Sequence, residues 1–338
     1  MSDPNHKHSA RSASSTEKQI GAAAQELDNQ PITTRLRINQ TSLKKLALIA
    51  GGYGLLILIS VWLIYDLTHL SDVFNVSRWL FPVVVLLAFI FETMDSAAGM
   101  GFGTALAPLL LIMGFEPLQV VPVLLISESV TGLTSAAVHH EFKNVRFSLK
   151  NGANEATRLM LMITGFGIIA IIISVTLTYF AIELPGSAIK TYVAILVVLL
   201  GIVALARRFT KQTDTAYKPK RMIGFAFLGA FNKGIGGGGY GPVVTLGEIY
   251  SGVYEKSAPA IASLAEGLIS IVGIITFFAI SATGIELDFM LLPSALTGSI
   301  LAAVASPYLV RVLPNRIFSY VIPAYAFIIG IILLFNLT

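Results

Sequence analysis

The chain has 338 residues, of which 55% are hydrophobic and only 12% are charged, and its mean hydropathy is +0.77. Soluble domains carry about 25% charged residues, so this composition excludes an ordinary soluble globular protein. The absence of cysteine excludes disulfides and thiolate chemistry. The formal net charge of +4 becomes informative only when the basic residues are placed along the chain.

Apolar runs of about the length of a bilayer span recur along the chain and predict an all-α polytopic membrane protein. We expect a disordered cytoplasmic tail over residues 1–45, because this segment is polar, and a first transmembrane helix over 46–66. Two repeats are predicted, repeat 1 over 79–206 and repeat 2 over 222–336, joined by a basic cytoplasmic linker at 207–221. The other predicted full spans are 118–138, 159–180, 190–206, 258–281, 289–306 and 317–335.

The basic residues predict the orientation, because cytoplasmic loops carry an excess of Lys and Arg. Residues 1–45 contain seven basic residues against four acidic ones, and 207–221 contain six against Asp214 alone. The segments 140–158 and 307–316 are also basic. We therefore expect these segments and the N-terminus on the cytoplasmic side of a bacterial inner membrane.

Two glycine clusters interrupt apolar runs, AAGMGFGTALAP at 97–108 and IGGGGYGPVV at 235–244. Glycine is a poor helix former, so both predict a break in the helix. If the runs 80–113 and 222–251 crossed the membrane completely, the charge placement would be violated. We therefore predict that each is a re-entrant hairpin with the glycines at its tip, where backbone buried in protein or lining a cavity is tolerated.

A shift of 138 residues, the separation of Glu128 and Glu266, superposes the two halves without gaps. An odd number of predicted full spans separates the hairpins, so the halves are inverted. The predicted fold is an N-terminal anchor helix and two inverted repeats, each with a glycine-tipped re-entrant hairpin and three spanning helices. Paired helix breaks in inverted repeats are typical of secondary transporters with a midplane site. The shift aligns Gly99, Gly101 and Gly103 with Gly237, Gly239 and Gly241.

The segments AGMGFGTALAPLLLIMG and NKGIGGGGYGPVV, each followed by an apolar helix, resemble the sulfite exporter TauE/SafE family. The resemblance covers roughly residues 80–335. It implies the movement of small sulfur anions such as sulfite, or of organosulfonates such as sulfoacetate, across the bacterial inner membrane. Nothing in the residue spacing itself indicates sulfur.

The glycine segments predict an anion site on physical grounds as well. A short helix is expected to begin after each tip, near Thr104 and near Pro242, and each start offers free N–H groups and the positive end of a helix dipole. The alternative is that the glycines only allow helices to pack closely. The predicted substrate-binding residues are Gly99, Gly101, Gly103, Thr104, Lys233, Gly237, Gly239 and Gly241, with Ser127, Ser129 and Asn232 as second-rank contacts.

Buried acids complete the predicted site. Glu128 and Glu266 lie in the middle of predicted spans, where a charge costs about 2.5–3.5 kcal/mol on insertion scales and usually faces a cavity. We predict that they carry coupling protons; the alternative is that they are neutral and only bond neighbouring helices. Asp95 and Lys233 occupy equivalent repeat positions with opposite charge, and we expect an ion pair between them where the hairpins meet.

The sequence thus predicts a secondary transporter that exports a small sulfur-containing anion, sulfite or an organosulfonate, by alternating access coupled to the proton or electrochemical gradient. A passive anion channel and a non-transporting sensor or assembly protein remain alternatives. No enzyme is predicted, because no nucleophile, base and orienting acid are grouped, and neither a cofactor nor a metal is expected. The basic loops suit anionic lipid of the bilayer rather than nucleic acid, and helix packing would permit a homodimer.

Overall fold

The structure is a computed structural model, and it describes residues 20–48, 51–52, 55, 81–99, 101–150, 152–206, 217–254, 256–312, 324, 327–328, 331–332 and 334–335. All regular elements within these residues are helices, and no strand occurs among them. The prediction of an all-α protein is therefore confirmed for the described part of the chain. The predicted spans at 46–66 and 317–335 lie largely outside it, as does most of the linker 207–221.

Five of the described helices are long and apolar enough to cross a membrane, judged by length and composition. Each lies on a predicted span, which supports a multi-pass membrane protein. They comprise α7 (Pro117–Glu141), α8 (Glu155–Thr176) with its π-helical extension η3 (Leu177–Ala181), α9 (Gly186–Ala206), α12 (Ala258–Ser281) and α13 (Leu292–Val312).

Local capping signals determine where some of these helices begin. Helix α7 starts at Pro117, whose missing N–H would have no partner inside the helix. The preceding residue Glu116 forms a capping box with Gln119, whose Oε1 accepts the Glu116 N–H at 2.9 Å. Helix α8 is capped by Asn154, which accepts the Thr157 N–H at 3.0 Å.

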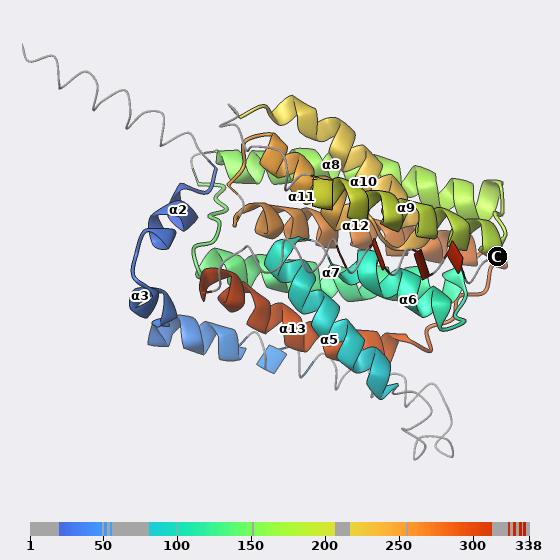
Figure 1. Ribbon diagram of the computed structural model, residues 1–338, viewed down its shortest axis with the longest axis horizontal. Coiled ribbons are helices and arrows are strands. Elements are labelled where there is room, and N and C mark those ends of the chain that lie inside the picture. The colour runs from blue at the N-terminus through green and yellow to red at the C-terminus, as the bar shows by residue number, and fades with distance from the viewer. Residues whose placement is uncertain are drawn as a thin grey trace, which may run out of the picture.

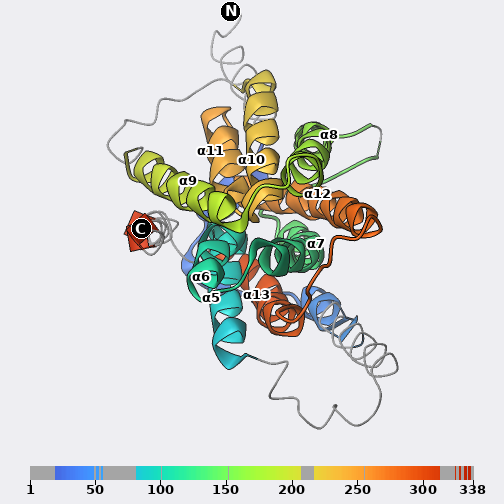
Figure 2. The ribbon, with the colours of Figure 1, turned by 90° about the vertical axis from the view of Figure 1, so that its right-hand side faces the viewer.

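Helices α7 and α12 pack against each other in the middle of the bundle, and most long helices run roughly along its long axis (Figure 1). Viewed along that axis in Figure 2, α5 (Pro82–Ala98) and α13 lie on one side of this pair, and α8 and α10 (Met222–Gly236) lie on the other. Helix α5 packs on α13, and α10 packs on α8. Because a shift of 138 residues relates α5 to α10 and α8 to α13, these two contacts are equivalent.

Both glycine clusters break the helix, as predicted. Helix α5 ends at Gly99 with φ 65°, and the chain continues as the π-helix η2 (Phe102–Leu106) and α6 (Ala107–Ile112). Helix α10 ends at Gly237 with φ 74°, and α11 (Tyr240–Tyr250) follows after Gly239 with φ 83°. Only glycine adopts these left-handed conformations without strain. The return helices begin two residues earlier than predicted, at Phe102 and Tyr240 rather than near Thr104 and Pro242.

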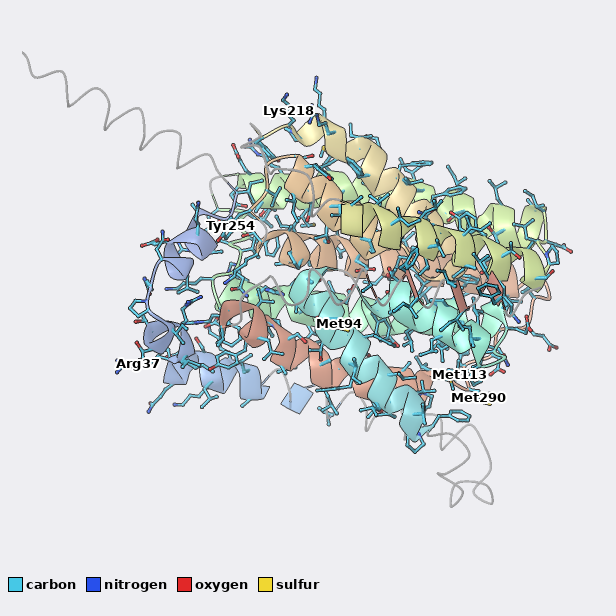
Figure 3. All side chains as sticks on the ribbon, in the orientation of Figure 1. Arg37, Met94, Met113, Lys218, Tyr254 and Met290 are labelled. Atoms are coloured by element: carbon cyan, nitrogen blue, oxygen red, sulfur yellow. The ribbon has the colours of Figure 1, made fainter. Side chains whose placement is uncertain are left out.

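The helices that flank each turn contact one another, α5 with η2 and α10 with α11. In Figure 3, Lys218 before α10 and Tyr254 after α11 both lie in the left-hand half of the molecule. Met94, one turn before the end of α5, lies near the middle, and Met113 after α6 lies in the right-hand half. The chain therefore turns inside the bundle at each glycine cluster.

The prediction of a disordered tail is wrong for the part of residues 1–45 that the structure describes. Helices α2 (Ala22–Asp28) and α3 (Ile32–Leu36) lie in this segment. Ile20 is only 5% exposed, and its carbonyl accepts the Tyr254 N–H at 3.3 Å. The Arg311 side chain donates to the carbonyls of Arg35 at 2.8 Å and Arg37 at 3.1 Å. Contacts with the bundle thus order a segment whose composition is polar.

Candidate functional site

The two glycine turns meet inside the bundle and are bonded to each other. The Gly239 N–H donates to the Thr104 hydroxyl at 3.1 Å, and the Thr245 hydroxyl donates to the Gly99 carbonyl at 3.1 Å. A Cβ on Gly238 would lie 2.5 Å from the Gly103 carbonyl oxygen, so no side chain fits there. The predicted tip glycines therefore allow close contact between two backbones, in agreement with the packing alternative.

Gly101, Gly237 and Gly241 take part in the same close packing. A Cβ on Gly241 would lie 2.5 Å from the Gly99 carbonyl oxygen, and one on Gly101 would lie 2.5 Å from the Phe91 carbonyl oxygen of α5. A Cβ on Gly237 would contact Leu124 of α7 at 3.1 Å. All the predicted substrate-binding glycines thus lie at or beside the place where the turns meet, in contact with protein atoms.

Lys233 lies fully buried between two glutamates from different helices. Its Nζ forms ion pairs with Glu128 of α7 and with Glu266 of α12, the latter at 2.8 Å. The side chains of these glutamates are 3% and 8% exposed. The Tyr240 ring, at the start of α11, has its centre 5.7 Å from the Lys233 Nζ. The structure thus brings together three residues that the sequence assigned to coupling and binding.

The predicted ion pair between Asp95 and Lys233 is wrong, because the carboxylate of Asp95 is engaged elsewhere. It accepts backbone hydrogen bonds from Gly101 and Phe102, at the start of the first return helix. Asp95 has a short side chain at the end of α5, next to these amides, whereas the long side chain of Lys233 reaches the two glutamates. The two residues are electrostatic neighbours but not bonded partners.

A further buried acid, Glu92, belongs to the same cluster and was not predicted. It is 2% exposed and accepts hydrogen bonds from the hydroxyls of Ser96 at 2.8 Å and Thr131 at 3.2 Å. Its electrostatic neighbours are the other acids of the site. Its position one turn before Asp95 in an apolar run was the available signal. The buried cluster therefore contains four carboxyl groups and one ammonium group: Glu92, Asp95, Glu128, Glu266 and Lys233.

The second-rank polar contacts differ in their bonding. The Ser129 hydroxyl donates to the Ile126 carbonyl of its own helix at 2.7 Å. The Asn232 Oδ1 accepts a hydrogen bond from the Tyr192 hydroxyl, but its Nδ2 has no partner among the described residues. The Ser127 hydroxyl is also buried and unpartnered. Asn232 and Ser127 therefore keep unused donors next to the ion-paired residues, and Ser129 does not.

The Tyr240 hydroxyl is a second group that sequence reasoning missed. Tyr240 is 1% exposed, its hydroxyl has no hydrogen-bond partner in the described part of the chain, and its electrostatic neighbours include Asp95, Glu128 and Glu266. Nothing in the sequence distinguishes this tyrosine from a packing residue. The site thus holds an unused donor beside the acids.

His139 is fully buried at the end of α7 and has a defined hydrogen-bonding role. Its Nε2 lies 2.9 Å from the Ser96 carbonyl, which can only accept, and its Nδ1 lies 2.9 Å from the Asn144 amide nitrogen, which can only donate. Asn144 also donates to the Pro307 carbonyl at 3.1 Å. This network assigns the proton to Nε2 and indicates a role in joining α5, α7 and α13.

The chain was compared with known proteins. It matches the model of the family described as Sulfite exporter TauE/SafE over residues 83–333. A protein of Bacillus subtilis (strain 168), named Probable membrane transporter protein YtnM, is 28% identical over 169 residues, which cover 48% of this chain and 52% of that protein. The chain therefore spans about half the length of this curated relative. No solved structure matches.

The family match covers both glycine turns and all the buried charges of the site. The resemblance inferred from the glycine segments is therefore confirmed. The chain belongs to the sulfite exporter TauE/SafE family.

Proposed function

We propose that this protein is a secondary transporter that exports a small sulfur-containing anion, sulfite or an organosulfonate, across the bacterial inner membrane, with its N-terminus in the cytoplasm. The observation that carries the proposal is the buried Lys233 held between Glu128 and Glu266 where two broken helices meet. Ionisable residues at such depth are expensive and mark substrate or proton pathways. The family match supports the substrate class.

The equivalent contacts of α5 with α13 and of α10 with α8 support two structurally related repeats. The positions of Lys218 and Tyr254 at one end, with Met113 toward the other, support re-entrant hairpins that enter from opposite sides (Figure 3). Movement of one repeat against the other would expose the site to each side in turn, as alternating access requires.

The ion pairs provide a way to link proton and anion binding. When a proton binds to Glu266, that carboxyl becomes neutral and no longer balances the charge of Lys233. The ammonium group, with the unused donors of Asn232 and Tyr240 nearby, then attracts an anion. Release of the proton restores the ion pair and repels the anion. Proton and anion would therefore bind and leave together.

Co-transport with a proton is consistent with export. A dianion that leaves with one proton removes one net negative charge, so an inside-negative membrane potential drives it outward. A potential of 100 mV contributes about 2.3 kcal/mol for each charge moved. Acidification of the side that holds the substrate is expected to accelerate transport, because it favours the proton-loaded site.

Flux in proteoliposomes tests the proposal. Vesicles loaded with sulfite or sulfoacetate would be studied with an acidic lumen, with an acidic exterior, and with an imposed inside-negative potential. We expect saturable efflux that is faster with the acidic lumen and with the negative potential. Glu266→Gln and Glu128→Gln should remove the response to pH, whereas the control Glu116→Gln, in an exposed ion pair at a helix start, should keep it.

The other outcomes separate the alternatives. Efflux that does not respond to the pH gradient in any variant would identify a passive channel. If folded protein transported and bound none of the tested anions, the transporter proposal would be rejected in favour of a non-transporting membrane protein.

A further inference from the structure

The carboxylate of Asp95 lies against the starts of both return helices. It accepts backbone hydrogen bonds from Gly101 and Phe102, which open the helical segment Phe102–Ile112. A Cβ on Gly241, the second residue of α11, would lie 3.2 Å from the Asp95 Oδ1. Helix N-termini attract anions because their N–H groups are unpaired and their dipoles are positive. An internal anion thus occupies the position that the sequence assigned to the substrate.

Two unpartnered polar atoms mark the same place independently. The Tyr240 hydroxyl is fully buried without a hydrogen-bond partner, and Asp95 is one of its electrostatic neighbours. The Glu128 Oε1 is also buried and unpartnered, and it would lie 2.9 Å from a Cβ on Gly103. Buried polar groups are normally hydrogen-bonded, so a polar ligand between the turns would satisfy groups that the protein leaves unused.

We infer that Asp95 is an internal substitute for the transported anion, whose carboxylate holds the two helix starts in the substrate-free protein and leaves them when the substrate binds. This inference rests on the proposed function, because it requires an anion that binds between the glycine turns. Asp95 is suited to this role because it is 7% exposed and forms no ion pair with Lys233. Its hydrogen bonds are made with the flexible backbone of a glycine turn.

An internal substitute changes two measurable properties of a transporter. It competes with the substrate for the same amides, so it lowers the affinity for anions. It also neutralises the helix starts when the site is empty, which permits the empty protein to return and begin another cycle. Net efflux requires this return of the empty protein, whereas exchange of internal for external anion does not.

The Asp95→Asn variant isolates this effect, because it removes one charge and keeps the shape of the side chain. The other groups that face Asp95 stay in place in this variant. They come from every helix packed around it: Glu92 of α5, Glu128 of α7, Lys233 of α10, Tyr240 of α11 and Glu266 of α12.

The experiment compares net efflux and exchange of sulfite in proteoliposomes, together with the affinity for sulfite from thermal stabilisation of purified protein. For Asp95→Asn we expect about tenfold higher affinity, equivalent to about 1.4 kcal/mol. We expect net efflux to fall by at least the same factor while exchange is retained. Asp288→Asn is the matched control, because it alters a carboxylate that accepts a hydrogen bond from Gln119 at 2.7 Å, outside the site.

A purely structural role for Asp95 predicts a different result, in which net efflux and exchange fall together and affinity does not rise. That result would overturn the inference and leave the proposed function intact. If wild-type protein showed neither flux nor binding and Asp95→Asn did not gain them, both would be rejected. Should Asp95→Asn fail to fold, Asp95→Ser removes the same charge and serves as the second variant, with the same expected separation of exchange from net efflux.

Discussion

Gly239 donates its backbone N–H to the hydroxyl of Thr104 at 3.1 Å, which bonds the second glycine turn to the first return helix across 135 residues of sequence. A second hydrogen bond, from the Thr245 hydroxyl to the Gly99 carbonyl, joins the same two regions in the opposite sense. Both bonds are buried. The two turns therefore form one unit in this conformation, and any movement that separates the repeats has to break these bonds.

Thr104→Val tests the bond between the turns. Valine has nearly the same shape but cannot accept the Gly239 N–H, so a buried donor loses its partner, at a cost of about 1–3 kcal/mol. We expect a lower thermal unfolding midpoint in detergent and slower transport. Thr104→Ser keeps the hydroxyl and is the matched control, with a stability close to that of wild type. Equal stability of the valine and serine variants would show that the bond contributes nothing.

The absence of a side chain at Gly238 is a second requirement of the site. A Cβ there would lie 2.5 Å from the Gly103 carbonyl oxygen, so Gly238→Ala must push the two turns apart. We expect loss of transport in proteoliposomes and a clear decrease in stability. Gly224→Ala is the control, because nothing lies within 4 Å of its Cβ position in α10. Alanine in a helix interior should stabilise this control by roughly 1 kcal/mol relative to glycine.

The positions of the two turns could be predicted from sequence for a physical reason. Glycine clusters and acidic residues are both unfavourable in a membrane helix, so their recurrence at a spacing of 138 residues carries information. The same spacing placed Glu128 and Glu266 in equivalent positions, and the structure joins both to Lys233. Features that are costly at each site separately are the ones that sequence reasoning located.

The partner of Asp95 could not be predicted in the same way. The repeat alignment places Asp95 opposite Lys233, and opposite charges at equivalent positions indicate an ion pair. The outcome depends on the path of the glycine turn, which brings the amides of Gly101 and Phe102 to the carboxylate. Turn geometry of this kind has no signature in residue spacing.

The N-terminal segment shows another limit. Its composition is polar, and α2 and α3 are only 7 and 5 residues long, too short to be stable alone. Their order depends on partners distant in sequence, such as Arg311 in α13. A tail that is docked by backbone carbonyls therefore has the same sequence properties as a disordered one.

Arg311→Gln tests this docking. The variant removes the charged donor that binds the carbonyls of Arg35 and Arg37, so α3 should detach from α13 more often. We expect faster tryptic cleavage after Arg35 or Arg37, measured by mass spectrometry under limited digestion in detergent. Arg146→Gln, at an exposed position, should leave the cleavage rate unchanged. An equal rate in wild type and Arg311→Gln would contradict the role of Arg311 in holding α3.

The ion pairs of Lys233 yield the last prediction. Removing one partner of a buried ion pair costs about 3–5 kcal/mol, because the remaining charge has no compensation. Lys233→Met should therefore lower the thermal unfolding midpoint strongly, since Glu128 and Glu266 both lose their cation. Lys190→Met is the matched control, because its ion pair with Glu116 is partly exposed and such pairs contribute about 0–1 kcal/mol.

The combined variant Lys233→Met, Glu128→Gln, Glu266→Gln separates the stability of the ion pairs from their role in transport. With all three charges removed, no buried charge is left unpaired, so we expect most of the lost stability to return. Transport should not return, because the variant has neither the cation that attracts the anion nor the acids that carry the proton. If the folded combined variant still exported sulfite in response to a pH gradient, these three residues would not be the coupling site, and the proton would have to bind another acid of the cluster, with Glu92 the first to test.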